Sequence, residues 1–313
     1  MITSCVIGGT GTIGLHVVDI LVKRKRQVIV VGRRDQALVS LPSGVNYYSH
    51  DYSDTTFLAN LLSRVDEVVC LAYTTNPKTS FDSPMADLTT NLVPMVNLFQ
   101  LASKTRVKKM VVVSSGGAIY GSVDKTPIRE DCATNPISPY GITKLAIEKY
   151  ALMFHRSDKL PVVIVRPGNS YGPGQKPFVG QGFVATTIAS ILAGKEVTVF
   201  GSKGTVRDYV YVTDIADGIM AAMEHGENGS CYNLGSGIGR NNLEVLHKIS
   251  LLAAESGYKF KIKILPKRPF DVETNILDSS ALKKATGWKI KTNFNQGIKL
   301  TWDWYLNNQD KWM

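Results

Sequence analysis

Short apolar runs alternate with longer amphipathic segments along the first half of the chain. Within the amphipathic segments, apolar residues recur at helical spacing, whereas the apolar runs are rich in Val and Ile. Strands that are apolar at nearly every position and alternate with helices are typical of a parallel sheet covered on both faces. We therefore predict an α/β fold with a doubly wound parallel sheet. The predicted strands are Ile2–Ile7, Gln27–Val31, Glu67–Leu71, Lys109–Ser114 and Val162–Val165, and the predicted helices lie near Ile13–Lys25, Pro84–Thr105 and Ser138–His155.

The pattern changes after Pro167. Gly and Pro cluster from there to Gln175, and the shorter elements that follow lack the strand–helix rhythm. We predict a dinucleotide-binding domain over residues 1–168 and a smaller substrate lobe over residues 169–313. Some segments of the lobe are expected to return to the first domain.

Charge and cysteine content exclude several classes of protein. The 36 basic and 26 acidic residues give a net charge of +10, but the basic residues are scattered and form no recognised nucleic-acid module. The excess charge suits a solvated basic surface or attraction for an anionic small molecule. The cysteines show no zinc spacing, and no apolar stretch reaches the roughly 20 residues that span a bilayer. We expect no metal, no nucleic acid, no membrane insertion and a cytoplasmic location, with Cys5 and Cys70 as buried free thiols.

A glycine-rich segment, Gly8–Gly14, follows the first predicted strand and opens the first predicted helix. Gly8 permits a tight turn, Gly11 lets the backbone approach a phosphate, and Gly14 lets helix and strand pack closely. The free N–H groups at the helix start would then face a pyrophosphate. The pattern predicts a bound dinucleotide, held by Gly8, Thr10, Gly11, Thr12, Ile13 and Gly14.

The end of the second strand indicates which dinucleotide. NAD sites usually carry an Asp or Glu there, which accepts a hydrogen bond from the ribose 2′-hydroxyl. In this chain Gly32 is followed by Arg33 and Arg34, and a guanidinium can pair with a 2′-phosphate instead. We predict a preference for NADP(H) through Arg33 with help from Arg34, with NAD(H) as the alternative if both side chains only face solvent. Asp51, after the third strand, is placed to meet the adenine amino group.

Tyr140 and Lys144 are four residues apart and therefore lie on one helix face. A free tyrosine has a pKa of about 10, but a nearby ammonium favours the phenolate. Tyr140 could then exchange a proton with a carbinol or carbonyl oxygen while a hydride moves at the adjacent carbon. The two residues predict an oxidoreductase step on a hydroxyl-bearing substrate.

These motifs occur in order with several others, and together the chain resembles an extended short-chain dehydrogenase/reductase of the NAD-dependent epimerase/dehydratase family. The resemblance implies a Rossmann-type fold, a nucleotide-diphosphate sugar substrate and a homodimer. Within this family, the chain is similar to UDP-glucose 4-epimerases and to reductases of 4-keto-6-deoxy sugar nucleotides. The further motifs are Ser114–Gly121, Arg166–Gly172, Arg207–Val212 and Arg268-Pro269-Phe270-Asp271.

The resemblance also implies roles for individual residues. Ser115 is the predicted third catalytic group, with Ser114 as the alternative because the register is uncertain by one. Asn91 resembles a residue that supports the site. Leu71 and Ala72 are expected beside the cofactor, and the expected substrate contacts are Ser115, Asn169, Arg207, Arg268 and Asp271. Surface ion pairing is the other interpretation of the two arginines.

Departures from the family pattern narrow the set of reactions that the sequence predicts. Tyr73 stands where the family often has a second alanine, and Gly116-Gly117 replaces the Asp-Glu pair that 4,6-dehydratases need for elimination. We predict reduction of a dTDP- or UDP-4-keto-6-deoxyhexose in surface polysaccharide precursor synthesis. The alternative is a UDP-glucose or UDP-N-acetylglucosamine 4-epimerase with tightly bound NAD, which would use the same catalytic residues. A non-catalytic nucleotide sensor is a third possibility, against which the intact Tyr–Lys pair argues.

Overall fold

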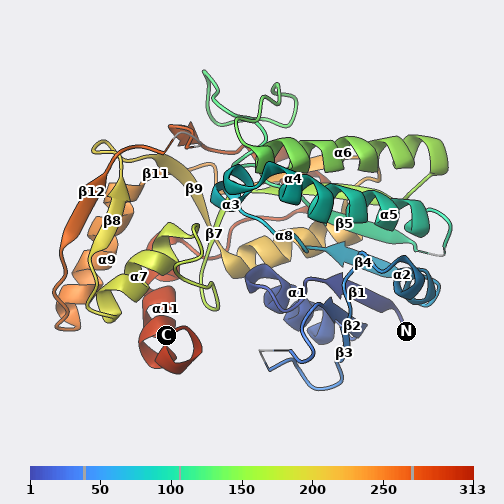
Figure 1. The fold of residues 1–313 in the computed structure, drawn as a ribbon, viewed down its shortest axis with the longest axis horizontal. Helices are drawn as coiled ribbons and strands as arrows, with labels where there is room; N and C mark the ends of the chain where they lie inside the picture. Colours follow the sequence, from blue (N-terminus) through green and yellow to red (C-terminus); the bar gives the residue numbers. More distant parts are fainter. Residues whose placement is uncertain (38–39, 106, 269–270) are drawn as a thin grey trace.

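A seven-stranded parallel sheet forms the centre of the first domain (Figure 1). The computed structural model describes residues 1–37, 40–105, 107–268 and 271–313. The sheet contains β1 (Thr3–Ile7), β2 (Gln27–Gly32), β3 (Asn46–Ser49), β4 (Glu67–Cys70), β5 (Lys109–Val113), β6 (Val162–Pro167) and β10 (Cys231–Leu234). Their order in space is β10-β6-β5-β4-β1-β2-β3. The chain reverses its direction of travel across the sheet between β1 and β4, the kind of switch point at which such sheets bind ligands.

Helices cover both faces of this sheet, which confirms the predicted doubly wound α/β class. One face carries α1 (Thr12–Lys23), α8 (Val212–His225) and α10 (Ser280–Thr286). The other carries α2 (Thr55–Leu62), α5 (Val93–Ala102) and α6 (Pro139–Asp158). The predicted bounds of the strands and of the helices α1 and α6 differ from these by no more than three residues.

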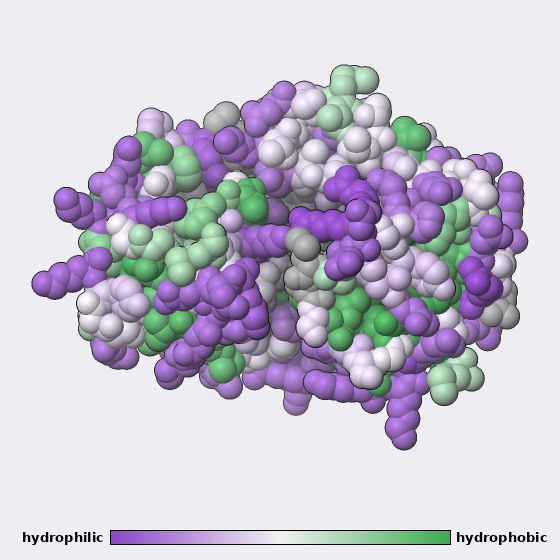
Figure 2. Space-filling view, turned by 60° about the horizontal axis from the view of Figure 1, so that its bottom comes forward, coloured by the Kyte–Doolittle hydropathy of each residue, from purple (hydrophilic) through white to green (hydrophobic). Residues whose placement is uncertain are grey.

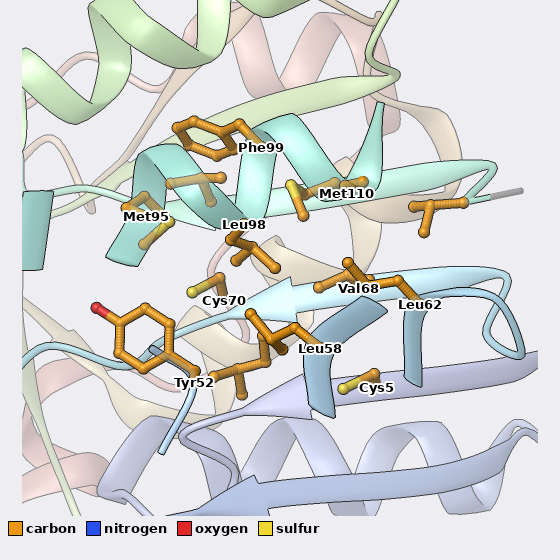
Figure 3. Packing of buried hydrophobic residues seen from close by; sticks show 14 of the residues in the cluster. Cys5, Tyr52, Leu58, Leu62, Val68, Cys70, Met95, Leu98, Phe99 and Met110 are labelled. Carbon is orange, nitrogen blue, oxygen red and sulfur yellow. The ribbon is translucent and has the colours of Figure 1, made fainter. Parts of the chain in front are cut away.

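Alternate residues of each strand enter the two cores. In β1, Cys5 and Ile7 pack toward α2 and α5, whereas Val6 packs toward α1 and α8. Figure 3 shows the first of these cores, where Leu58 and Leu98 lie beside strand β4. Because both faces are buried, the strands are apolar at nearly every position. Cys5 is a buried free thiol, and so is Cys70, as the sequence predicts.

The predicted helix Pro84–Thr105 is divided into three parts. The short α4 (Pro84–Asp87) leads into a π-helical turn, η1 (Leu88–Leu92), and α5 follows. Pro94 has no N–H and so cannot donate to the carbonyl of Thr90, which instead lies 3.5 Å from the Tyr52 hydroxyl. The altered winding points Asn91 inward, where it is fully buried.

The C-terminal part has its own sheets and its own core, at the left of Figure 1. The strands β7 (Asn169–Tyr171), β9 (Val206–Tyr211), β11 (Gly239–Asn241) and β13 (Thr274–Asn275) form one sheet, and β8 (Val197–Phe200) pairs with β12 (Ile262–Leu265). The helices α7 (Phe183–Leu192), α9 (Asn242–Glu255) and α11 (Phe294–Asn307) pack against them. Although both follow residue 168, β10 is a strand of the seven-stranded sheet and α8 packs on one face of that sheet. The division at residue 168 itself stays a prediction.

The surface between the two parts is hollowed, and hydrophilic residues border the hollow near the middle of the face in Figure 2. Within the described ranges, no helix is both long enough and apolar enough to cross a membrane.

Candidate active site

The loops that follow β1, β4, β5 and β6 meet at one edge of the sheet, because parallel strands all point the same way. They carry the glycine loop, Ala72 and Tyr73, Ser114 and Ser115, and Asn169, respectively. The Leu71 N–H donates to the Ile7 carbonyl at 2.9 Å, so the loop after β4 lies directly beside the glycine loop. The edge therefore brings together residues that are more than 150 positions apart in sequence.

The glycine loop fits a dinucleotide pyrophosphate. Gly8 has a φ of +84°, and a Cβ there would lie 2.9 Å from the backbone nitrogen of Ala72. A Cβ on Gly14 would lie 2.4 Å from the Gly8 carbonyl oxygen. Gly11 precedes α1 and gives no side-chain cap to the N–H groups of the first turn, which leaves them facing an incoming anion. The expected cofactor residues Gly8, Thr10, Gly11, Thr12, Ile13 and Gly14 lie together in this turn.

The predicted contacts to the adenosine end lie beyond β2 and β3. Arg33 and Arg34 are exposed, and the Arg34 carbonyl accepts a hydrogen bond of 2.7 Å from Tyr47. Asp51 is also exposed, and its Oδ1 accepts from the Ser53 N–H at 2.9 Å. These side chains are accessible for a cofactor.

The start of α6 fixes the Tyr–Lys pair. Ser138 caps the helix by accepting from the Gly141 N–H at 3.1 Å. The Tyr140 N–H donates to Ser80 Oγ, on the short helix α3 (Pro77–Asp82), at 3.1 Å. One turn later Lys144 is buried, and its ammonium donates to the Val113 carbonyl at the end of β5 at 2.9 Å. Both side chains are thus held at the carboxyl end of the sheet.

Of the two candidate serines, Ser115 is the one that faces Tyr140. The hydroxyls of these two residues share a hydrogen bond. The Ser114 hydroxyl is buried and has no partner within the described part of the chain. Sequence spacing allows either serine to be the partner of Tyr140. The conformation of the turn after β5 directs Ser115, not Ser114, toward Tyr140.

Burial dominates the electrostatics of the pair. Burial and, to a lesser extent, the charge of Asp87 together raise the pKa of Tyr140 to about 12, although the hydrogen bond from Ser115 acts to lower it. The protein's own groups therefore do not give the depressed pKa of Tyr140 that the sequence suggests. Burial lowers the pKa of Lys144 to about 8, although nearby Cys70 and the carboxylates of Glu148 and Asp87 act to raise it. Lys144 is still largely an ammonium at pH 7.

Asn91 and Asp87 form a buried polar cluster near Tyr140 and Lys144. Asn91 accepts from the Thr74 N–H at 2.8 Å and donates to the Asp87 carbonyl at 2.8 Å. Asp87 is fully buried and accepts from the hydroxyls of Thr75 and Tyr73, the latter at 3.2 Å. Asn91 thus points inward and fixes the loop after β4.

The predicted substrate residues gather on the C-terminal side of the hollow. Arg207 of β9 lies 3.7 Å from Asp271, and Arg268 donates to the same carboxylate at 2.7 and 3.0 Å. Asp271 is thus engaged by both guanidiniums. The intervening Pro269 and Phe270 of this motif lie outside the described residues.

Two contacts join this cluster to the catalytic loop. Asn275, which pairs in register with Arg207, donates to the Gly116 carbonyl at 2.9 Å. Asn169 Oδ1 lies 3.5 Å from where a Gly117 Cβ would be, and Ser115 Oγ lies 3.9 Å from the same point. Asn169 and Ser115 therefore flank one space.

With this geometry established, comparison with known proteins is informative. The sequence profile of the NAD dependent epimerase/dehydratase family matches residues 4–235. The chain belongs to this family. Its relatives include the UDP-glucose 4-epimerase of Mycolicibacterium smegmatis, 31% identical over 309 residues that cover 96% of this chain and 98% of that protein.

Two solved structures of family members are similar over almost their whole length. One is a UDP-glucose 4-epimerase from Thermotoga maritima with UDP-glucose, with a TM-score of 0.92, 35% identity, and coverage of 98% of this chain and 100% of that one. The other is the UDP-glucose 4-epimerase of Thermus thermophilus in complex with NAD, with a TM-score of 0.90, 34% identity and the same coverage. As a member of the epimerase/dehydratase family, the protein is an NAD-dependent enzyme of nucleotide-sugar chemistry.

Several residues of this family member escaped sequence reasoning. Asp87, Ser80 and Asn275 contact Tyr73, the Tyr140 N–H and the Gly116 carbonyl, respectively, all at the candidate site. The sequence does contain an indication for Asp87, because it precedes Asn91 by four positions in a predicted helix and therefore lies on the same helix face. Ser80 and Asn275 had none, because their contacts span 60 and 159 residues of sequence.

Proposed function

We propose that this protein is a UDP-hexose 4-epimerase, acting on UDP-glucose or UDP-N-acetylglucosamine, that retains NAD as a resident cofactor. The hydride-and-proton chemistry of the proposal, which a 4-keto reductase would share, is supported by the hydrogen-bonded Ser115–Tyr140 pair, with Lys144 held beside it, at the sheet edge next to a glycine loop that fits a dinucleotide. The observation that favours the epimerase over the reductase is the likeness to named 4-epimerases. These relatives match nearly the full length of the chain.

Each residue has a defined task in this reaction. The glycine loop Gly8–Gly14 would hold NAD, which would supply a hydride acceptor and donor for the sugar carbon. Tyr140 removes the proton from the sugar 4-hydroxyl during oxidation and gives one back during reduction. Ser115 shares that proton position through its hydrogen bond, and Lys144 supplies a positive charge close to the phenol, 5.8 Å from its ring centre. Arg207 and Arg268 supply the cationic groups for the substrate diphosphate.

Dehydration is disfavoured by the turn that follows Ser115. A Cβ on Gly116 would lie 2.5 Å from the Leu277 side chain and 2.9 Å from the Arg166 carbonyl oxygen. An acidic side chain therefore cannot be placed at Gly116 without moving backbone. Neither Gly116 nor Gly117 can supply the acid–base pair for elimination.

A 4-keto-6-deoxyhexose nucleotide reductase using NADP(H) is the second candidate. One observation favours it: the exposed Arg33 and Arg34 follow β2 where NAD-binding sheets usually carry a carboxylate. The solved relative from Thermus thermophilus is a complex with NAD, which weighs toward the epimerase.

The two candidates are separated by one pair of assays. For the epimerase, purified protein converts UDP-galactose into UDP-glucose with no added cofactor, as followed by chromatography, and acid denaturation releases NAD. For the reductase, the protein consumes stoichiometric NADPH with dTDP-4-keto-6-deoxyglucose, and the cofactor released from denatured protein is NADP. Failure to interconvert the UDP-hexoses together with NADPH consumption contradicts the epimerase proposal.

We further propose that the enzyme is a homodimer that pairs through α5 and α6. These helices pack together on one face of the sheet and expose apolar side chains on their outer surface. Val93 is 50% exposed, Ile142 57% and Met153 43%. Ile142 and Met153 are three helical turns apart and lie on the same stripe of α6.

A further inference from the structure

Tyr73 follows Ala72 at the point where this chain departs from the two small residues common in the family. Its ring centre lies 4.0 Å from the Lys144 ammonium and 4.9 Å from the ring of Tyr140, which it meets edge to face at 73°. An ammonium this close to an aromatic face is attracted by the ring's quadrupole. Since Lys144 also donates to the Val113 carbonyl, backbone and ring hold the ammonium between them.

The far end of Tyr73 is anchored. Its hydroxyl donates to Asp87 Oδ1 at 3.2 Å and also has a hydrogen bond with Thr143. Asp87 is itself fully buried and held by Thr75 and Asn91. The ring can therefore leave Lys144 only if a buried hydrogen bond to a carboxylate is broken, which is costly.

We propose that Tyr73, anchored by Asp87, is a positioning residue that holds Lys144 beside Tyr140. The inference rests on the proposed function, in which Tyr140 moves the proton. Tyr73 touches no reacting atom. It fixes the ammonium and keeps water from it, so that the charge stays close to the phenol throughout the reaction.

Asp87 also acts on the pair through its charge. The groups that face Lys144 are Cys70 from β4, Glu148 from α6 and Asp87 from α4, in addition to the two tyrosine rings. Ser115 and Asp87 face Tyr140. Of the carboxylates named here, only Asp87 affects the ionisation of both Lys144 and Tyr140. Its negative charge favours the ammonium of Lys144 and disfavours the phenolate of Tyr140.

The first experiment separates the ring from the hydroxyl. Tyr73→Ala removes both, Tyr73→Phe removes only the hydroxyl, and Tyr232→Phe is the matched control, because that buried hydroxyl has its bond with Glu227 far from the site. Tyr73→Ala is expected to lower kcat about 30-fold, the equivalent of a desolvated cation–π contact of about 2 kcal/mol. The KM of the nucleotide sugar should stay within about twofold. Tyr73→Phe should lower kcat only about threefold.

The second experiment needs no turnover. Asp87→Asn keeps the shape of the side chain and removes its charge. Ionisation of Tyr140 is followed by tyrosinate absorbance as the difference between each protein and its Tyr140→Phe partner, so that the other tyrosines cancel. Loss of the negative charge should lower the midpoint by on the order of one pH unit. In turnover, both limbs of the kcat/KM profile should move to lower pH, because Lys144 also loses a stabilising charge.

Two results would overturn the inference. One is a Tyr73→Ala protein whose kcat per folded molecule equals that of Tyr232→Phe, which would leave Tyr73 with a packing role only. The other is a Tyr140 midpoint that does not move in Asp87→Asn. If the unsubstituted protein does not epimerise UDP-hexoses, the proposed function fails on its own, and the tyrosinate titration still decides whether Asp87 is coupled to Tyr140.

Discussion

Tyr140 illustrates how a single side chain depends on its surroundings. It is half-buried, bonded to Ser115, and placed edge-on against Tyr73. Its raised pKa means that the protein alone keeps the phenol protonated near neutral pH. A positive charge on a bound cofactor would favour the phenolate. In the proposed reaction, proton removal by Tyr140 would thereby be linked to cofactor binding.

Tyr140→Phe tests the proton-transfer role. The variant keeps the ring and loses the hydroxyl that is proposed to exchange the proton, so turnover should fall by about 10²- to 10⁴-fold. Retention of NAD, measured as the cofactor released on denaturation, should stay close to that of the unsubstituted protein. Tyr258→Phe, at a half-buried position packed against the core of the C-terminal part, serves as the control. Turnover equal to this control would remove Tyr140 from the mechanism.

At the scale of elements, α6 links the reaction to the fold. Tyr140, Lys144 and Glu148 recur every four residues on the same face of the helix. Glu148 accepts two short hydrogen bonds from the buried Arg166 of β6, at 2.6 and 3.0 Å. Arg166 also donates to the Tyr120 hydroxyl at 2.8 Å. The pair fastens α6 to β6, the strand that leads into the C-terminal part.

Glu148→Ala should destabilise the protein strongly. The buried guanidinium of Arg166 would lose its charge partner, and breaking a buried pair from one side costs about 3–5 kcal/mol. Urea unfolding followed by fluorescence measures the loss. Glu255→Ala, at the exposed end of α9, is the matched control. If both variants unfold at the same urea concentration, the buried pair contributes nothing to stability.

At the scale of the whole molecule, two parts with separate cores enclose the site between them. Thr12 in the cofactor loop donates to the Gly174 carbonyl at 3.3 Å, and Asn76 after β4 donates to the Val179 carbonyl at 2.8 Å. Both bonds cross from helix starts at the carboxyl end of the first sheet to the segment that precedes α7. Cofactor and substrate would therefore be bound at a junction that contacts from both parts hold together.

The proposed dimer is also a property of the whole molecule. Met153→Glu places a charge in the exposed apolar surface of α6 and should shift the protein from twice the chain mass to the chain mass in light scattering. Ile264→Glu, at a 58% exposed position on β12, is the control and should leave the mass unchanged. A Met153→Glu protein that keeps the dimer mass would rule out this surface as the interface.

The sequence by itself determined the sheet class, the tight glycine turn before α1 and the shared helix face of Tyr140 and Lys144. These features are local: buried strands require apolar runs, a tight phosphate turn requires glycines, and a four-residue interval on a helix puts two side chains on one face. It also identified Tyr73 as a departure from the family. It did not foresee the π turn at η1, where Pro94 interrupts an otherwise helical pattern.

Only the tertiary structure decided which partners these residues have. Ser115 rather than Ser114 faces Tyr140, Tyr73 lies over Lys144, and Asp271 joins Arg207 to Arg268. Tyr73 and Lys144 are 71 residues apart, and Arg207 and Asp271 are 64 apart. Sequence spacing fixes side-chain direction within one element. The meeting of distant side chains depends on how whole elements pack, because their positions are set by the sum of all core contacts.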